Sequence, residues 1–140
     1  MSKRLDRADL TEKLRGAGLR PTRQRLFLAQ LLFSNGENVH VTADILFAQV
    51  VEAGARLSLT TVYNTLHHFA EAGLLRALKV APDRIWYDTR TDPHHHFYHV
   101  NEGRLEDIAV QDVRFAALPA APEGAQIAGV DVVIRLETDI

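Results

Sequence analysis

Four histidines and several carboxylates fall within the twenty residues from Asp88 to Asp107. Imidazole and carboxylate groups together favour divalent transition metals such as Fe(II), Mn(II) and Zn(II). His94 and His96 are two residues apart, so on an extended strand both side chains leave the same face and could reach one ion. A run of three histidines is also compatible with a solvated polar loop, so the choice between these interpretations depends on the rest of the chain.

The chain before this cluster predicts helices at residues 10–17, 23–33, 42–54 and 58–73. Thr22 and Thr42 stand where the second and third helices begin, which is the usual place of an N-cap residue. Glycines end the first, third and fourth helices. In the fourth helix we expect a buried apolar stripe made of Leu59, Val62, Leu66 and Phe69.

The opposite face of the fourth helix carries hydroxyl, amide and imidazole groups, whereas an ordinary solvated face is rich in Lys and Glu. Its residues are Thr60, Thr61, Tyr63, Asn64, His67, His68 and Glu71. Such groups suit hydrogen bonds and methyl contacts to base edges in the major groove of DNA. The pattern favours a DNA-reading helix, with an ordinary exposed helix as the alternative.

Two short strands, 75–80 and 84–88, follow this helix and are joined by the turn sequence Ala81-Pro82-Asp83. Helices followed by a hairpin are typical of a winged helix-turn-helix, in which the fourth helix reads DNA and the hairpin is the wing. Basic side chains of this half would contact phosphates, which gives affinity without sequence information. They are Arg20, Arg23, Arg25, Arg56, Arg76 and Lys79.

The charge is distributed unevenly along the chain. Residues 1–80 carry eleven Lys and Arg against seven Asp and Glu, a net charge of +4. Residues 81–140 carry five Arg against eleven Asp and Glu, a net charge of -6, so the formal total is only -2. This asymmetry suggests that the first half alone meets a polyanion.

Beyond Pro93 the pattern predicts strands at 96–100 and 104–108, a helix at 111–118 and a long strand at 126–136. We therefore expect an α+β protein with a winged-helix DNA-binding domain at 1–90 and a small α/β domain at 91–140. About fifty residues bury little core alone, and a reader of twofold DNA sites needs a dimer. The second domain should therefore pair with a second copy of the chain.

Composition limits the remaining classes of protein. No apolar stretch approaches the roughly 18 residues of a membrane helix, and the charged first seventeen residues are unlike a secretory signal. We therefore expect a cytoplasmic protein without a membrane partner. The chain has no cysteine, which removes disulfides and thiolate metal sites.

The helix sequence Leu59-Thr60-Thr61-Val62-Tyr63-Asn64-Thr65-Leu66, followed by a histidine-rich α/β segment, resembles the Fur family of metal-responsive repressors. The resemblance covers the chain from Leu10 to Leu136. It implies a homodimer that binds double-stranded DNA at A·T-rich inverted repeats, and that in some cases pairs into a tetramer on DNA. We predict DNA contacts from Arg20, Thr60, Thr61, Tyr63, Asn64 and Arg76.

Members of this family hold a regulatory metal between their two domains with five ligands. The resemblance places these ligands at His40, Asp88, His94, His96 and Asp107. The implied ion is Fe(II) or Mn(II), with Zn(II) able to replace it in vitro. By binding one arrangement of the domains better than others, the ion would shift the population toward the DNA-binding form.

Two other metal sites of the family are altered here. The structural zinc site uses two Cys-x-x-Cys pairs, and the first pair's positions hold His99 and Glu102, so we predict no four-cysteine zinc. The expected positions of a further site fall at Pro93, His95, Arg114 and Val130, which leaves one possible ligand.

The missing cysteines, the triplet His94 to His96 and the ending at residues 130–136 are similar to the iron response regulator (Irr) branch of the family. That resemblance implies a regulator, mainly a repressor, of iron-uptake, iron-storage and haem-synthesis genes. It also implies haem as the effector, bound by His94, His95 and His96, because imidazole is a common axial ligand of haem iron.

Other functions stay open at this point. Aspartate at both acid positions also occurs in peroxide-sensing relatives, and manganese and zinc sensors share the same fold. A His/Asp metalloenzyme is a more distant alternative, since an enzyme needs an open coordination position and a nearby acid or base. No catalytic sequence motif supports it, so we predict a regulator rather than an enzyme.

Overall fold

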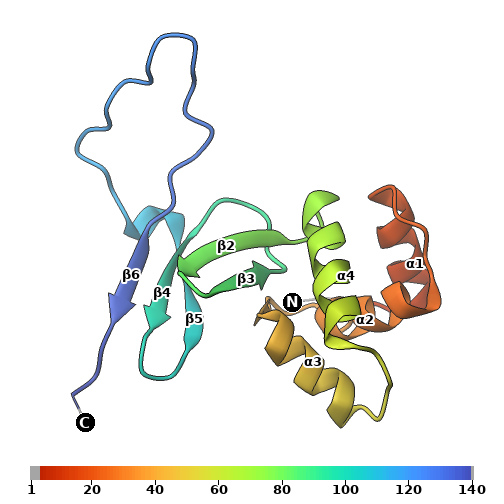
Figure 1. Cartoon of the computed structure of the whole chain (residues 1–140). Coiled ribbons are helices and arrows are strands. Elements are labelled where there is room, and N and C mark those ends of the chain that lie inside the picture. The colour runs from red at the N-terminus through yellow and green to blue at the C-terminus, as the bar shows by residue number, and fades with distance from the viewer. Residues whose placement is uncertain (1–3, 140) are drawn as a thin grey trace. The chain divides into compact units, whose positions relative to one another are not determined.

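The computed structural model describes residues 4–139, which form two compact units divided between Thr91 and Asp92 (Figure 1). The described part of the first unit contains four helices and a three-stranded sheet. That of the second contains another three-stranded sheet and a long irregular segment. This mixture of helices and small sheets agrees with the predicted α and β composition.

The helices of the first unit are α1 (Arg7–Gly16), α2 (Arg23–Phe33), α3 (Ala43–Glu52) and α4 (Leu59–Glu71). Each begins after a side chain that accepts a hydrogen bond from a backbone N–H of the first turn, which stabilises the start of the helix. These N-cap residues are Asp6, Thr22, Thr42 and Ser58. After α3 and α4 the chain turns at Gly54 and Gly73 with φ of 77° and 84°, values that glycine adopts without strain.

The core of the first unit lies between the apolar faces of these helices. Val62, Leu66 and Phe69 of α4 are fully buried, as predicted, and the Phe69 ring lies 6.3 Å from that of Phe33 on α2. Leu59 was predicted to join this stripe, but it is 42 % exposed. It is the first residue of α4, one position after the N-cap.

The sheet of the first unit contains β1 (His40–Val41), β2 (Arg76–Ala81) and β3 (Arg84–Asp88) in the order β1-β3-β2, all antiparallel. Strands β2 and β3 are the predicted hairpin. Strand β1 was not predicted, because two residues are too few to show an alternating pattern. It adds a strand from the segment before α3 to the far edge of β3.

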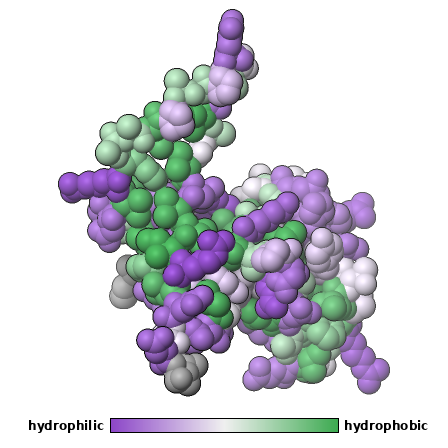
Figure 2. All heavy atoms as spheres, turned by 60° about the vertical axis from the view of Figure 1, so that its left-hand side comes forward, coloured by the Kyte–Doolittle hydropathy of each residue, from purple (hydrophilic) through white to green (hydrophobic). Residues whose placement is uncertain are grey.

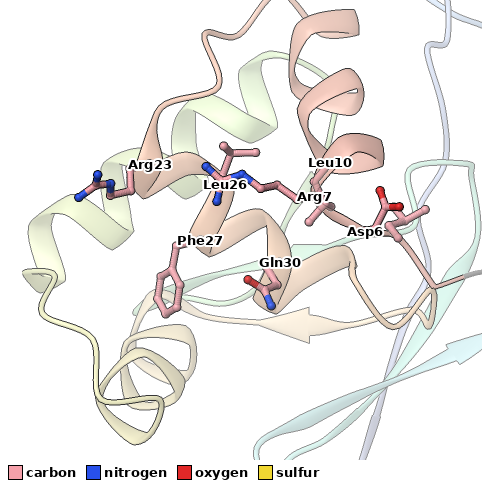
Figure 3. Close-up of a pocket in the computed structure, with 8 residues that line it drawn as sticks. Asp6, Arg7, Leu10, Arg23, Leu26, Phe27 and Gln30 are labelled. Atoms are coloured by element: carbon pink, nitrogen blue, oxygen red, sulfur yellow. The ribbon is translucent and has the colours of Figure 1, made fainter.

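A surface pocket of about 290 Å³ lies between α1 and α2 (Figure 3). Its walls are formed by Leu5, Asp6, Arg7, Leu10, Arg23, Leu26, Phe27 and Gln30. The backbone N–H of Leu5 donates to the carbonyl of Ser34 at 2.8 Å, which ties the start of α1 to the end of α2. Lys13 of α1 also lies over the Phe33 ring, 4.8 Å from its centroid. These contacts fix α1 against the rest of the unit.

The second unit is built on β4 (His95–His99), β5 (Arg104–Ile108) and β6 (Val133–Leu136). Strand β4 is central, antiparallel to β5 and parallel to β6. One turn of 3-10 helix, η1 (Val110–Asp112), follows β5.

Residues 113–132, which we call the arm, join η1 to β6 and leave the sheet as a long loop (Figure 1). The predicted helix at 111–118 is wrong, since only the 3-10 turn η1 overlaps its first two residues. A short helix is marginal without packing, and Phe115 and Leu118 of this segment are largely exposed. The predicted strand at 126–136 is wrong in its first part, since pairing with β4 begins only at Val133. The arm exposes apolar side chains (Figure 2), namely Phe115 (44 %), Leu118 (49 %) and Ile127 (52 %).

Candidate metal centre and nucleic-acid face

In the first unit, two of the five predicted metal ligands face each other across neighbouring strands. His40 of β1 is the backbone partner of Asp88 at the end of β3, and the His40 Nε2 atom lies 3.2 Å from Asp88 Oδ2. The Asp88 side chain is fully buried. Its other oxygen, Oδ1, accepts a hydrogen bond from the backbone N–H of Arg90 at 2.9 Å, which fixes the carboxylate. We call His40 and Asp88 the β1–β3 pair.

The other three predicted ligands meet within the second unit, and we call them the β4–β5 triad. His96 of β4 is the backbone partner of Asp107 on β5. The Asp107 Oδ1 atom lies 3.1 Å from His94 Nε2 and 3.4 Å from His96 Nε2. The two imidazole rings are 4.4 Å apart, on the same side of the chain as their spacing of two predicts.

His94 has a fixed orientation and a defined tautomer. Its Nδ1 atom lies 2.7 Å from the carbonyl oxygen of Asp92. A carbonyl can only accept, so Nδ1 carries the proton and Nε2 of the neutral ring presents a lone pair. This lone pair is directed at the Asp107 carboxylate, and two acceptors at 3.1 Å repel each other unless a proton or a cation lies between them.

The spacing of these atoms suits a common metal ion. Ligands bound at about 2.0–2.2 Å with bond angles near 90–110° are roughly 3.0–3.5 Å apart, because the ion lies between them. The nitrogen-to-oxygen distances of 3.1 and 3.4 Å in the triad fall in this range. The ligand atoms of His94, His96 and Asp107 all lie within 4.8 Å of one another. Two imidazoles and one carboxylate therefore fit a divalent transition metal.

His95 does not share this arrangement with its neighbours. Its Nδ1 atom accepts a hydrogen bond of 3.0 Å from the backbone N–H of Val132, and its ring meets the Phe115 ring edge-on at 6.1 Å. The three histidines predicted to bind haem are therefore divided between two directions. The contact with Val132, which lies far along the chain, could not be read from the sequence pattern.

The positions of the family's first cysteine pair hold an ion-pair cluster. His99 Nε2 lies 2.9 Å from Glu106 Oε1, and Arg104 contacts the carboxylates of both Glu102 and Glu106. The Arg104 guanidinium lowers the pKa of Glu102, first by hydrogen bonding and then by charge. In this hairpin, acidic, basic and imidazole side chains therefore contact one another at and beside the positions where the resemblance implies two cysteines.

The predicted DNA-contacting residues of α4 line two hollows in the first unit. Asn64 borders a polar groove of about 470 Å³ together with the predicted Arg20. The other residues of this groove are Thr22, Gln24, Arg25, Thr61, Thr65 and His68, of which the sequence had assigned no role to Gln24 and Thr65. Arg23 and Arg25 at the start of α2, beside Gln24, were the available signal for this groove. Two guanidinium groups and several hydroxyl and amide groups in one groove suit a phosphate backbone.

Thr60 and Tyr63 line a second hollow, of about 360 Å³, beside the β2–β3 turn. Tyr63 is 46 % exposed. Buried Tyr87 also lines this hollow, and its pKa is raised above 10.0 by burial and then by the nearby Tyr63. The Thr61 hydroxyl instead accepts a hydrogen bond from the Ser58 hydroxyl at 3.0 Å, so part of its hydrogen-bonding capacity is used within the protein.

Arg76 is the predicted DNA contact with the least suitable position. It is half-buried at the start of β2, where its backbone partner is Asp88, at the opposite end of the hairpin from the turn. This position is beside the β1–β3 pair, so a contact between Arg76 and DNA stays a prediction.

No helix within residues 4–139 is long and apolar enough to cross a membrane.

Comparison with known proteins identifies the class of this chain. A ferric uptake regulator family model matches residues 16–135. The ferric uptake regulation protein of Legionella pneumophila is 30 % identical over 99 residues, which cover 70 % of this chain and 72 % of that protein. The corresponding protein of Shigella flexneri is 32 % identical over 88 residues, covering 63 % of this chain and 58 % of that protein. The peroxide-responsive repressor PerR of Staphylococcus aureus is 30 % identical over 95 residues, or 68 % and 63 % of the two chains.

Solved structures show the same fold. The ferric uptake regulator of Vibrio cholerae superposes with a TM-score of 0.73 and 20 % identity, over 91 % of this chain and 98 % of that chain. The manganese-containing regulator of Pseudomonas aeruginosa gives a TM-score of 0.67 with 22 % identity, over 94 % and 98 %. Because the family model spans most of the sequence and the fold agrees, this chain belongs to the ferric uptake regulator family.

Proposed function

We propose that this protein is a metal-responsive, DNA-binding transcription regulator that acts in the cytoplasm as a homodimer. The observation that carries the metal part is the β4–β5 triad, in which His94 Nε2 lies 3.1 Å from the Asp107 carboxylate while its Nδ1 contacts the Asp92 carbonyl. A divalent cation between them would bind both atoms. The family assignment favours such a regulator over the metalloenzyme considered as an alternative.

We further propose that the β1–β3 pair and the β4–β5 triad bind one ion together, as the family resemblance implies. Two ligands or three leave a transition metal short of the four to six that it usually binds in proteins, whereas five ligands suit Fe(II) or Mn(II). The pair belongs to the first unit and the triad to the second. Binding at both would restrict the arrangement of the two units. Metal binding would thereby change the affinity of the protein for DNA.

The DNA-binding role is assigned to the first unit, as a winged helix with α4 as the recognition helix and the β2–β3 hairpin as the wing. Its support is the exposed polar face of α4 and the groove that Asn64 shares with Arg20 and Arg25. The guanidinium groups would contact phosphates, and the α4 side chains would contact base edges. An A·T-rich inverted repeat is the expected target.

The dimer is assigned to the second unit. Its sheet buries few apolar side chains, chiefly Leu105 and Ile108, while the arm exposes Phe115, Leu118 and Ile127. Exposed apolar side chains on a small unit are typical of a surface that pairs with another chain. A second copy covering the arm would supply the missing burial. Tetramers on DNA are part of the same proposal.

The deciding experiment compares Asp107→Asn with Glu106→Gln, two neighbours on β5. Asn keeps the shape of Asp107 but removes the charge that an ion needs, so Mn(II) affinity should fall by at least about tenfold. Glu106 faces His99 rather than the triad, so its variant should bind Mn(II) like the wild type. Calorimetry gives affinity and stoichiometry, and fluorescence anisotropy with a labelled inverted repeat gives DNA binding.

One Mn(II) per chain, lost equally in Asp88→Asn and Asp107→Asn, is the outcome expected for a single shared ion. Two weak sites with independent losses would reject the shared centre. Equal Mn(II) affinity in Asp107→Asn and Glu106→Gln would reject the triad as a metal site.

A matched pair on α4 tests the DNA face. Tyr63→Ala should weaken binding to the inverted repeat by at least about tenfold, since a good base contact is worth roughly 1–3 kcal/mol. His67→Ala removes a similarly exposed ring on the same face that pairs with Glu71 at 3.3 Å and is not among the predicted DNA contacts, so its loss of affinity should be clearly smaller. Equal effects of the two variants would contradict the assignment of Tyr63.

The finer proposal is that the signal is haem, as in the iron response regulator branch, and that iron and haem genes are the targets. Its support is the sequence, with the triplet His94 to His96 and no cysteine. Haem titration into the DNA complex should give a histidine-type Soret band that grows as the complex dissociates. DNA binding that follows only Mn(II) or Fe(II) would leave a metal sensor and remove haem from the proposal.

Peroxide, manganese and zinc sensing are equally compatible with the family assignment and the ligand set. A peroxide sensor of this type oxidises a ligand histidine at bound Fe(II). Mass spectrometry after Fe(II) and peroxide would then show one added oxygen on His40 or His94, and a clean spectrum would argue against it.

A further inference from the structure

The side chains of β4 and of His94, which directly precedes it, point to two faces of the sheet and have different partners on each. On one face, His94 and His96 meet Asp107 of β5. On the other, His95 contacts the arm at both of its ends. The Phe115 ring near the start of the arm packs edge-on against the imidazole, and the N–H of Val132 at the end of the arm donates to Nδ1 at 3.0 Å. Residues seventeen positions apart are therefore held by one side chain.

Val132 is bound to β4 through both of its backbone groups. Its carbonyl accepts a hydrogen bond of 3.1 Å from the N–H of His96, while its own N–H is bound by the His95 side chain. The next residue, Val133, begins β6 and is the backbone partner of His96. The end of the arm is thus fixed by two consecutive residues of β4, and one of them belongs to the β4–β5 triad.

We infer that His95 is a positioning residue that couples the β4–β5 triad to the arm. An ion held by His94 and His96 fixes the backbone on both sides of His95 and so restricts its ring. The restricted ring then holds Phe115 and Val132, and with them the exposed apolar face of the arm. This inference rests on the proposed function, since it assumes an ion at the triad and gives that ion a route to the dimer surface.

The chemistry of imidazole makes this role incompatible with ligation by His95. Nδ1 accepts from Val132, so the neutral ring carries its proton on Nε2. Coordination through Nε2 would move the proton to Nδ1 and place two N–H groups against each other. An iron atom bound to His95 would therefore release Val132, whereas an ion at His94 and His96 would hold it. One strand can thus transmit two opposite signals to the arm.

The test uses two amide variants of the full-length chain that differ in where they place an acceptor. In His95→Asn the side-chain oxygen lies near the position of Nδ1, and in His95→Gln it lies one bond further, near that of Nε2. The first variant should keep the bond to Val132 and the second should lose it. His95 is not a ligand of the proposed ion, so the Zn(II) affinity of both variants, measured by calorimetry, should stay within about threefold of the wild type.

Amide hydrogen exchange of the arm, and of Val132 in particular, is measured by NMR with and without Zn(II). Zn(II) is diamagnetic and therefore does not broaden the signals. Zn(II) should slow exchange by about fivefold or more in the wild type and in His95→Asn, as one hydrogen bond allows. In His95→Gln the zinc effect should be less than about twofold. Equal zinc effects in the two variants, or none in the wild type, would overturn the coupling.

Failure of the proposed function looks different. If Zn(II) does not bind any of the three proteins, the metal proposal is wrong and the coupling falls with it. The zinc-free exchange of Val132 still reports the contact itself, which should be faster in His95→Gln than in His95→Asn. If zinc binds all three with the expected affinity and arm exchange never responds, the metal proposal stands and only the coupling is rejected.

Discussion

Burial raises the pKa of the Tyr87 hydroxyl, and the neighbouring Tyr63 raises it further. The fold therefore favours the neutral phenol of Tyr87. The stability that this contributes is complete below the ordinary pKa of 10.0, and it is lost as the pH rises through the higher pKa of the folded state. The free energy of unfolding should therefore fall as the pH rises above 10.0.

Substitution of Tyr63 tests this link between the two hydroxyls. In Tyr63→Phe the charge that opposes ionisation of Tyr87 is gone, so the pKa of Tyr87 should move down but stay above 10.0, because burial is the larger cause. Ultraviolet titration of the phenols measures it, with Tyr98→Phe as the control that keeps both members of the pair. An unchanged titration of Tyr87 in Tyr63→Phe would show that burial acts alone.

Single residues also show how far the sequence could predict the site. The spacing of His94 and His96 predicts one shared face, because alternation along an extended chain is a property of the backbone. The carbonyl of Asp92 that orients His94 and the N–H of Val132 that binds His95 are backbone groups. Every residue carries such groups, so no side-chain pattern marks which of them will be used.

At the scale of elements, predictions succeeded where local signals agreed. Helix α2 begins after Thr22 and ends at Phe33 as predicted, because Thr22 is an N-cap residue and the turn-forming sequence Ser34-Asn35-Gly36 follows Phe33. Strand β1 is held by its partner β3 and by bonds between Val39 and Thr89, which are fifty residues apart in the chain. The arm similarly depends on distant contacts, so propensity misjudged both segments.

Helix α1 offers a test of local signals in isolation. Asp6 accepts from the N–H of Asp9 at 2.8 Å, and Asp9 accepts from the N–H of Asp6 at 3.0 Å, which makes a reciprocal capping box. Asp6→Ala should lower the free energy of unfolding by about 1 kcal/mol in urea. Glu12→Ala, an exposed change in the same helix, should have almost no effect. Equal losses in the two variants would show that the cap does not stabilise α1.

At the scale of the whole molecule, the two units differ in how much core they bury. Most of the fully buried apolar side chains belong to α1–α4 and their sheet, whereas the second unit buries chiefly Leu105 and Ile108. Apolar burial is the main stabilising term in folding. The second unit should therefore be the less stable of the two.

Urea unfolding of the metal-free protein should show two transitions, with loss of the second unit first. Mn(II) at a hundred times its dissociation constant should stabilise the transition of the β4–β5 triad by about 2.7 kcal/mol, because it binds only the folded form. Asp107→Asn should abolish this shift and Glu106→Gln should retain it. Far-ultraviolet circular dichroism follows the helices of the first unit and the fluorescence of Trp86 follows its strand β3, while NMR signals of the β4 and β5 amides follow the second unit. A single transition whose urea midpoint does not change with Mn(II) would contradict the expectation.

The exposed arm also affects how long the protein survives. Arg114 is exposed and is the one basic residue between Arg104 and Arg135, so trypsin-like proteases have a single cleavage bond there. Cleavage would separate Phe115 from η1 while leaving the sheet intact. Under the proposed pairing, a partner chain that covers the arm would shield this bond, and a solitary chain would not. Proteolysis could then remove unassembled copies, so that the amount of regulator in the cell follows the amount that has found a partner.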